Sequence, residues 1–65
     1  MRNRIQEMRA AKSLTQQELA DELAVTRATV VALEKGNYNP SLELAFRLAV
    51  YFKTDIENIF SIKGR

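Results

Sequence analysis

The sequence predicts an all-α fold, a compact five-helix bundle formed by one domain over residues 1–65. Apolar residues recur at the three- and four-residue spacing of helices along the chain. Ser, Thr and Gly residues separate these runs at positions typical of helix caps. No alternating run is long enough to predict a strand with any strength. The central feature is the stretch 16–33, which reads as two short helices joined by the tight turn Ala24-Val25-Thr26.

The first two helices are expected at about 3–12 and 16–23. Ile5 and Met8 mark the buried side of the first helix, and Asn3 is a candidate for its cap. Thr15 and Glu18 form a capping box before the second helix, in which each side chain bonds the backbone N–H of the other residue.

The third helix is expected at about 27–35, between Thr26 as N-cap and Gly36 as the residue that ends it. The turn before it begins with Ala24, at a position that often needs a positive φ. A positive φ at this alanine costs roughly 1–3 kcal/mol.

The fourth helix is expected at about 42–53 with Ser41 as its cap, and the fifth at about 55–60 with a capping box over 54–57. The fourth has an apolar stripe of Leu44, Ala45, Leu48, Ala49 and Phe52. The side chains predicted to form the core of the domain are Ile5, Met8, Leu19, Leu23, Val30, Leu33, Leu48 and Phe52.

Composition excludes several classes of function. The chain has no Cys and no His, which removes disulfides, zinc-finger spacing and Cys/His catalysis. We therefore expect no metal, no cofactor and no enzymatic activity. No apolar run approaches the roughly 18 residues of a membrane span, so we expect a cytoplasmic protein. The net charge of +2 is a weak argument for nucleic acid.

The helix at 27–35 has an outer face that suits a DNA major groove. On a helical wheel Val30 and Leu33 point to one side, and Ala28 and Ala32 to nearly the opposite side. Arg27 lies in the first turn, where it can read guanine O6 and N7 for roughly 1–3 kcal/mol of discrimination. The alanines can contact thymine methyl groups. The alternative to a DNA contact is a solvated cation for Arg27 and ordinary surface positions for Ala28 and Ala32.

Several motifs at fixed spacing resemble the Cro/repressor-type (XRE-like) helix-turn-helix family. They are LTQ-x-ELA from position 14, a small residue at 20, V-T-R in the turn, LEKG at 33–36 and NPSL before the fourth helix. The resemblance implies a lambda-repressor-like DNA-binding domain. It also implies sequence-specific binding to double-stranded DNA by a homodimer, with repression of transcription as the usual outcome.

The resemblance also assigns roles to individual residues. It implies that Arg9 and Glu34 form a structural ion pair between the first and third helices. The residues expected to contact DNA, through bases or phosphates, are Gln16, Thr26, Arg27, Ala28, Thr29, Ala32, Asn37, Tyr38 and Asn39. For Gln16 the alternative is a capped helix end in water, and the hydroxyl of Thr29 could simply cap its own helix.

The sequence departs from the family at three positions. Ala24 stands where the family usually has Gly, Ala28 where many relatives have Gln, and Asn37 where many have Lys. These differences affect the turn, one base contact and one phosphate contact.

The C-terminal residues Ile59, Phe60 and Ile62 are unusually apolar for a chain end. We expect them to form a two-fold dimer interface that sets two recognition helices about 34 Å apart, one turn of DNA. The alternative is that Ile59 and Phe60 fold back onto their own core.

Two other functions remain as alternatives. One is a protein-binding module on the same fold, such as an antitoxin-like or anti-regulator domain, which the apolar outer face and low net charge favour. The other is a small-ligand sensor, for which the core looks too small to hold a pocket of roughly 300 Å³.

Overall fold

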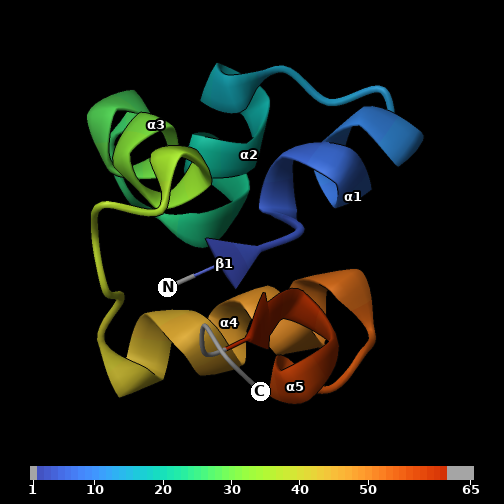
Figure 1. Ribbon diagram of the computed structural model, residues 1–65. Helices are drawn as coiled ribbons and strands as arrows, with labels where there is room; N and C mark the ends of the chain where they lie inside the picture. Colours follow the sequence, from blue (N-terminus) through green and yellow to red (C-terminus); the bar gives the residue numbers. More distant parts are fainter. Residues whose placement is uncertain (1, 62–65) are drawn as a thin grey trace.

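The computed structural model describes residues 2–61, which form five helices and one small sheet. The elements are β1 Arg2–Asn3, α1 Ile5–Ala11, α2 Gln16–Leu23, α3 Arg27–Lys35, α4 Leu42–Phe52, α5 Ile56–Ile59 and β2 Phe60–Ser61. α1, α2 and α3 lie together on one side of the molecule, and α4 and α5 lie on the other (Figure 1). The predicted all-α, five-helix fold is confirmed. Within 2–61 no helix is long and apolar enough to cross a membrane.

A single apolar core joins the two groups of helices. Six of the eight residues predicted for it are fully buried, and the other two, Met8 and Phe52, are partly buried and pack against it. The largest completely enclosed side chains are Ile5, Leu19, Val30, Leu33, Leu48 and Ile59, each at most 1% exposed. The two helices of the central stretch pack directly on each other through this core.

The predicted capping residues of the middle helices form the expected bonds. The Oγ1 of Thr15 accepts the backbone N–H of Glu18 at 3.0 Å, and the N–H of Thr15 donates to Glu18 Oε1 at 2.8 Å. Thr26 and Ser41 likewise accept the N–H groups three residues later. These bonds satisfy N–H groups that a helix start leaves without partners, which fixes where α2, α3 and α4 begin.

The predicted start of the first helix is wrong by two residues. Asn3 belongs to β1, and α1 begins only at Ile5 after Arg4. The Oδ1 of Asn3 accepts the N–H of Ile5 at 3.1 Å, while its Nδ2 donates to the carbonyl of Leu33 at 2.7 Å. Asn3 therefore serves the helix start from outside the N-cap position and ties the strand to α3.

The predicted capping box of the fifth helix is also wrong. α5 spans only Ile56–Ile59, and its N-cap Asp55 makes no side-chain capping bond. Thr54 Oγ1 instead accepts a bond from Asn58 Nδ2 at 3.0 Å. Thr54 stands one residue too early to cap this short helix.

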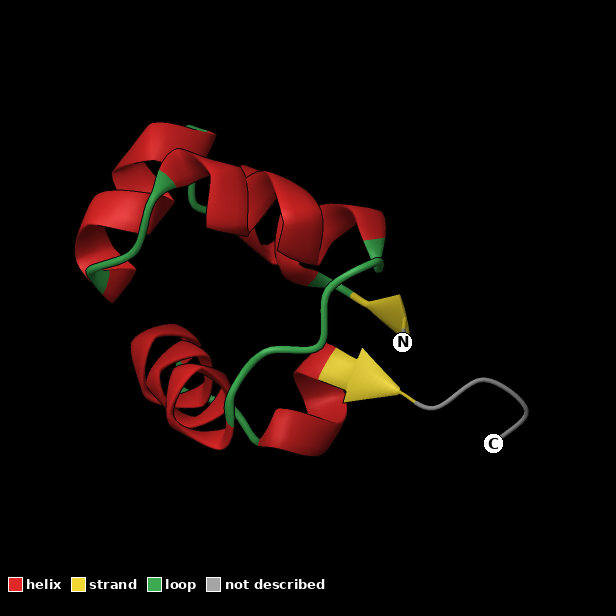
Figure 2. Cartoon of the chain, turned by 90° about the vertical axis from the view of Figure 1, so that its left-hand side faces the viewer, coloured by secondary structure: helices red, strands yellow, loops and turns green. Residues whose placement is uncertain are grey.

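The two ends of the described chain pair in a short antiparallel sheet. Arg2 lies opposite Ser61 and Asn3 opposite Phe60, and the strands are side by side in Figure 2. The N–H of Arg4 continues the pairing with a bond to the carbonyl of Ile59 at 2.9 Å. Strands of two residues have no periodicity for a sequence to reveal, so the helix prediction could not include them.

The structure corrects the prediction for the C-terminal residues. Ile59 is 1% exposed and Phe60 is 9% exposed, both in the core of their own chain. The ladder with β1 draws Phe60 inward, so these two side chains are not available as a dimer surface. This is the alternative that the sequence left open. Ile62 lies outside the described residues.

Candidate nucleic-acid interface

The turn between α2 and α3 sets how α3 is presented. Ala24 ends α2 in the left-handed conformation with φ of 58°, and its N–H bonds the carbonyl of Asp21. The chain can then reverse within three residues, and Val30 and Leu33 pack inward on α2. The opposite side of α3 is left toward solvent.

The outer side of α3 is a surface hollow with cations at its two ends. The hollow is about 450 Å³, and it is lined by Arg27, Ala28, Val31, Ala32, Lys35 and Asn37. Arg27 and Lys35 are the first and last residues of α3. The middle of the hollow carries only alanine and valine side chains, so nothing bulky prevents close approach of a partner.

A second hollow of about 540 Å³ adjoins the first at the start of α2. It is lined by Arg9, Thr15, Gln16, Gln17 and Arg27. Arg27 borders both hollows, and within residues 2–61 no carboxylate forms an ion pair with it. The exposed guanidinium of Arg27 therefore lies where α3 and the N-terminus of α2 meet.

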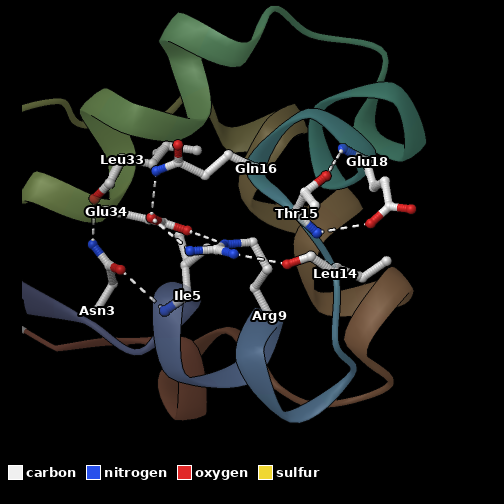
Figure 3. Close-up of polar contacts among 9 residues, drawn as sticks. All are labelled: Asn3, Ile5, Arg9, Leu14, Thr15, Gln16, Glu18, Leu33 and Glu34. Atoms are coloured by element: carbon white, nitrogen blue, oxygen red, sulfur yellow. Dashed lines mark hydrogen bonds and ion pairs between the residues drawn. The ribbon is translucent and has the colours of Figure 1, made fainter.

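Beneath the second hollow, Arg9 and Glu34 join α1 to α3. The Nε of Arg9 donates to Glu34 Oε2 at 2.6 Å and its Nη2 to Oε1 at 3.3 Å. The remaining Nη1 donates to the carbonyl of Leu14 at 2.7 Å, and Gln16 Nε2 donates to Glu34 Oε1 at 3.0 Å (Figure 3). The side chains of Arg9 and Glu34 are only 16% and 6% exposed.

The charges of Arg9 and Glu34 compensate each other within the fold. The hydrogen bonds that Arg9 donates to the Glu34 carboxylate raise the pKa of the Arg9 guanidinium above its ordinary value, against the opposing effect of burial. The positive charge of Arg9 is thus matched within the fold. Arg9 borders the interface, but its charge is already neutralised by Glu34.

The predicted DNA residues on the first turn of α3 fall in two groups. Thr26 and Thr29 bond each other through their hydroxyls at 3.1 Å, and Thr26 Oγ1 also accepts the N–H of Thr29. These two hydroxyls are engaged in the helix cap. Arg27 and Ala28, between them in sequence, are exposed on the hollow.

The predicted loop residues separate in space as well. Asn37 lines the α3 hollow, whereas Tyr38 and Asn39 are exposed in the loop beyond it and border neither hollow. Tyr38 is 42% exposed. The structure thus brings Arg27, Ala28, Ala32 and Asn37 together on one surface, with Gln16 next to it.

The sequence prediction missed Lys35, which lines the same hollow. Lys35 is seven residues after Ala28, so the two lie on the same face of the helix after two turns. The spacing could have identified it. A cation in the last turn of a helix is also expected simply from the helix dipole, so its residue type alone does not mark Lys35 as part of a binding surface.

Comparison with known proteins assigns the chain to a family. The helix-turn-helix family model matches residues 5–59. An uncharacterised HTH-type transcriptional regulator of Methanocaldococcus jannaschii is 50% identical over 60 residues, or 92% of this chain and 91% of that protein. One from Archaeoglobus fulgidus is 55% identical over 60 residues, with 92% and 84% covered.

More distant relatives have regulatory roles in their names. The cryptic phage CTXphi transcriptional repressor RstR of Vibrio cholerae is 32% identical over 59 residues, covering 91% of this chain and 53% of RstR. The HTH-type transcriptional activator BcrR of Enterococcus faecalis is 31% identical over 58 residues, covering 89% and 28%. The match over five helices and the geometry of α2 and α3 agree, and the chain belongs to the XRE-like helix-turn-helix family of transcriptional regulators.

Proposed function

We propose that this protein is a sequence-specific double-stranded DNA-binding regulator that inserts α3 into the major groove. The observation that carries the proposal is the α3 hollow, with Arg27 and Lys35 at its ends and small apolar side chains between them. An α-helix fits the major groove, and the groove offers acceptors on guanine and methyl groups on thymine. This surface would read guanine through Arg27 and thymine methyls through Ala28, Val31 and Ala32.

Phosphate contacts would come from the start of α2 and the loop after α3. The N-terminus of α2 opens on the hollow that Gln16 and Gln17 line, and helix N-termini favour anions. Gln16 is held in place by its bond to Glu34. Asn37 at the other end of α3, with Tyr38 and Asn39 in the loop, would contact the backbone of the same duplex.

We propose that the protein binds as a dimer to a short inverted repeat and represses transcription. The relative RstR is named a repressor, which supports repression by this protein. The relative BcrR is named an activator, so the family includes both kinds of regulator. A reporter gene downstream of the operator separates the two: we expect lower expression when the protein is present.

Selection from random duplexes tests the proposal and yields the operator. The protein is mixed with short random duplexes at two salt concentrations, and the retained DNA is sequenced. We expect an inverted repeat containing a guanine, with affinity that falls as salt rises. Arg27→Ala should lose the guanine preference, at a cost of roughly 1–3 kcal/mol.

Two further variants serve as controls in this selection. Arg27→Lys keeps the charge but not the two-pronged geometry, so it should bind with reduced preference for guanine. Lys53→Asn removes an exposed cation at the end of α4, at a left-handed position that asparagine tolerates, and should leave the preference unchanged. Retention without enrichment at either salt concentration would contradict the proposal.

The second candidate is a protein-binding module on the same fold. The apolar middle of the α3 hollow and the net charge of only +2 favour it. Arg27→Glu separates the two candidates, because it reverses the charge that faces DNA. The variant should abolish DNA binding, whereas a protein partner that uses the apolar middle would still be retained.

A further inference from the structure

The outer face of α4 carries an apolar stripe that the DNA interface does not use. Leu42, Phe46 and Val50 are 70%, 54% and 76% exposed. Together with Tyr38 they are the exposed large hydrophobic side chains among the described residues. They are spaced four residues apart and so lie on one side of the helix, opposite the buried Leu44 and Leu48. A clustered stripe of exposed apolar side chains is a candidate interaction surface.

The stripe and the α3 hollow are on different parts of the molecule. α4 lies with α5 on one side of the fold, and α3 lies with α2 on the other (Figure 1). No residue of α4 lines the α3 hollow. A partner on the outer face of α4 would therefore not need to cover the residues proposed to read DNA.

We infer that the occupant of this face is a second copy of the same chain, packed with its α4 antiparallel to the first. The stripe is symmetric about Phe46, with Leu42 four residues before it and Val50 four residues after it. A two-fold axis at Phe46 brings Leu42 of each chain onto the partner's Val50. It also places the two Phe46 rings against each other.

The charges beside the stripe match the same symmetry. Glu43 and Arg47 lie on one flank of the stripe, are 74% and 46% exposed, and form an ion pair of 2.6 Å within the helix. The antiparallel arrangement places this flank of each chain against the same flank of its partner. With a rise of about 1.5 Å per residue, Glu43 of one chain then lies only about 3 Å along the axis from the partner's Arg47. Two ion pairs between chains result.

The size of the face predicts a weak dimer. A stable interface of ordinary size buries about 800 Å² on each partner, and one face of an 11-residue helix offers less. A hollow of about 470 Å³ beside Phe46 and Val50, between α4 and the end of α2, adds area that a partner side chain can fill. We therefore expect dissociation in the micromolar range.

The inference rests on the proposed function only in supplying the two-fold symmetry for an inverted repeat. It also replaces the C-terminal interface that the sequence suggested, because Ile59 and Phe60 are buried. Dimerisation is measured without DNA, so failure of the dimer and failure of DNA binding are separate results.

Sedimentation of the whole chain over the micromolar range is the first test. We expect a monomer–dimer equilibrium, shifted to monomer by at least tenfold in Val50→Glu. Val50 is 76% exposed, so this substitution removes little packing inside the chain. Glu57→Arg reverses an exposed charge on α5 and should not change the equilibrium.

Mixing two charge-reversal variants tests the contact between chains directly. Glu43→Arg and Arg47→Glu each place like charges across the two-fold axis, so each alone should be mostly monomeric. An equal mixture places opposite charges across both contacts and should recover the dimer as a heterodimer. The clash that each variant creates within its own helix is the same in the mixture, so only contact between chains explains recovery.

Three results would overturn the proposed dimer through α4. A monomer at every concentration, a dimer unaffected by Val50→Glu, or a mixture no more dimeric than its components would each refute this surface. Circular dichroism tests whether every variant is folded. If Val50→Glu unfolds, Leu42→Glu takes its place, because Leu42 is 70% exposed.

Discussion

At the residue scale, the Arg9–Glu34 pair is the polar contact with the largest structural consequence. Each of its charges is mostly buried, and Leu14 and Gln16 supply the remaining hydrogen bonds. A buried charge pair adds little stability compared with apolar packing, but breaking it leaves an uncompensated charge inside. The pair also orients Gln16, so the same contact links the fold to the proposed phosphate site.

Glu34→Gln tests this cost. The amide keeps the shape but leaves the Arg9 charge without a counter-charge, so we expect a loss of roughly 3 kcal/mol in the free energy of unfolding. For a domain of this size the melting temperature should fall by at least about 12 °C. The control is Glu7→Gln, which breaks the exposed Arg4–Glu7 pair and should cost under about 1 kcal/mol. Equal shifts in the two variants would contradict the assignment.

The raised pKa of Arg9 fixes how this contribution depends on pH. A basic group whose pKa is higher in the folded than in the unfolded state stabilises the fold below its unfolded pKa. That stability is lost only as the pH rises through the raised folded pKa. Because both values lie in the strongly alkaline range, the Arg9 contribution should stay constant across neutral pH.

At the scale of the helices, left-handed residues end or follow α1, α2 and α4, and none of them is glycine. Ser13, Ala24 and Lys53 have φ of 56°, 58° and 56°, while α3 ends on Gly36. Residues with a Cβ pay a steric cost in this conformation, of roughly 1–2 kcal/mol for each. The helix ends therefore hold conformational strain that the core packing maintains.

Ala24→Gly should release this strain in the turn before the recognition helix. We expect stability to rise by about 1 kcal/mol, because glycine removes the Cβ clash, although part of that gain is offset by its greater freedom in the unfolded chain. Thermal unfolding measures the change. Ala10→Gly, at an exposed and ordinary helical position in α1, should instead lose about 1 kcal/mol. A destabilised Ala24→Gly would contradict the strain.

At the scale of the whole molecule, pairing of β1 with β2 closes the core. β2 holds Phe60 over it, and Asn3 in β1 bonds the carbonyl of Leu33 in α3. The small sheet thereby links α3 to the segment that follows α5, and so joins the two groups of helices. A domain of 65 residues is marginally stable, so we expect the loss of a core side chain such as Phe60 to remove a large fraction of its stability.

Phe60→Ala tests whether this residue serves the monomer core. Loss of the buried phenyl ring should lower the free energy of unfolding by about 3 kcal/mol. Phe60→Leu should lower it by about 1 kcal/mol and serves as the test if Phe60→Ala does not fold. Melting at several protein concentrations is the measurement. The drop in melting temperature relative to the unaltered protein should be the same at each concentration. If Phe60 served the dimer instead, this drop would depend on protein concentration.

The sequence by itself determined the number and order of the helices and the bounds of the middle ones, because the information that sets them is local. Capping residues at Thr15, Thr26 and Ser41 and the glycine at position 36 set where helices begin and end. The spacing of Val30 and Leu33 told which side of α3 packs inward, and therefore that Arg27, Ala28 and Ala32 face outward. The fold class and most of the candidate recognition surface follow from such local sequence patterns.

Only the tertiary structure decided contacts between distant segments. Pairing of β1 with β2, burial of Phe60 and the bond from Gln16 to Glu34 join residues 18 to 59 positions apart, and none has a local pattern. The exposure of Leu42, Phe46 and Val50 was settled the same way. A helix with apolar residues on both sides can bury only one of them, and the neighbours against which it packs determine which side that is.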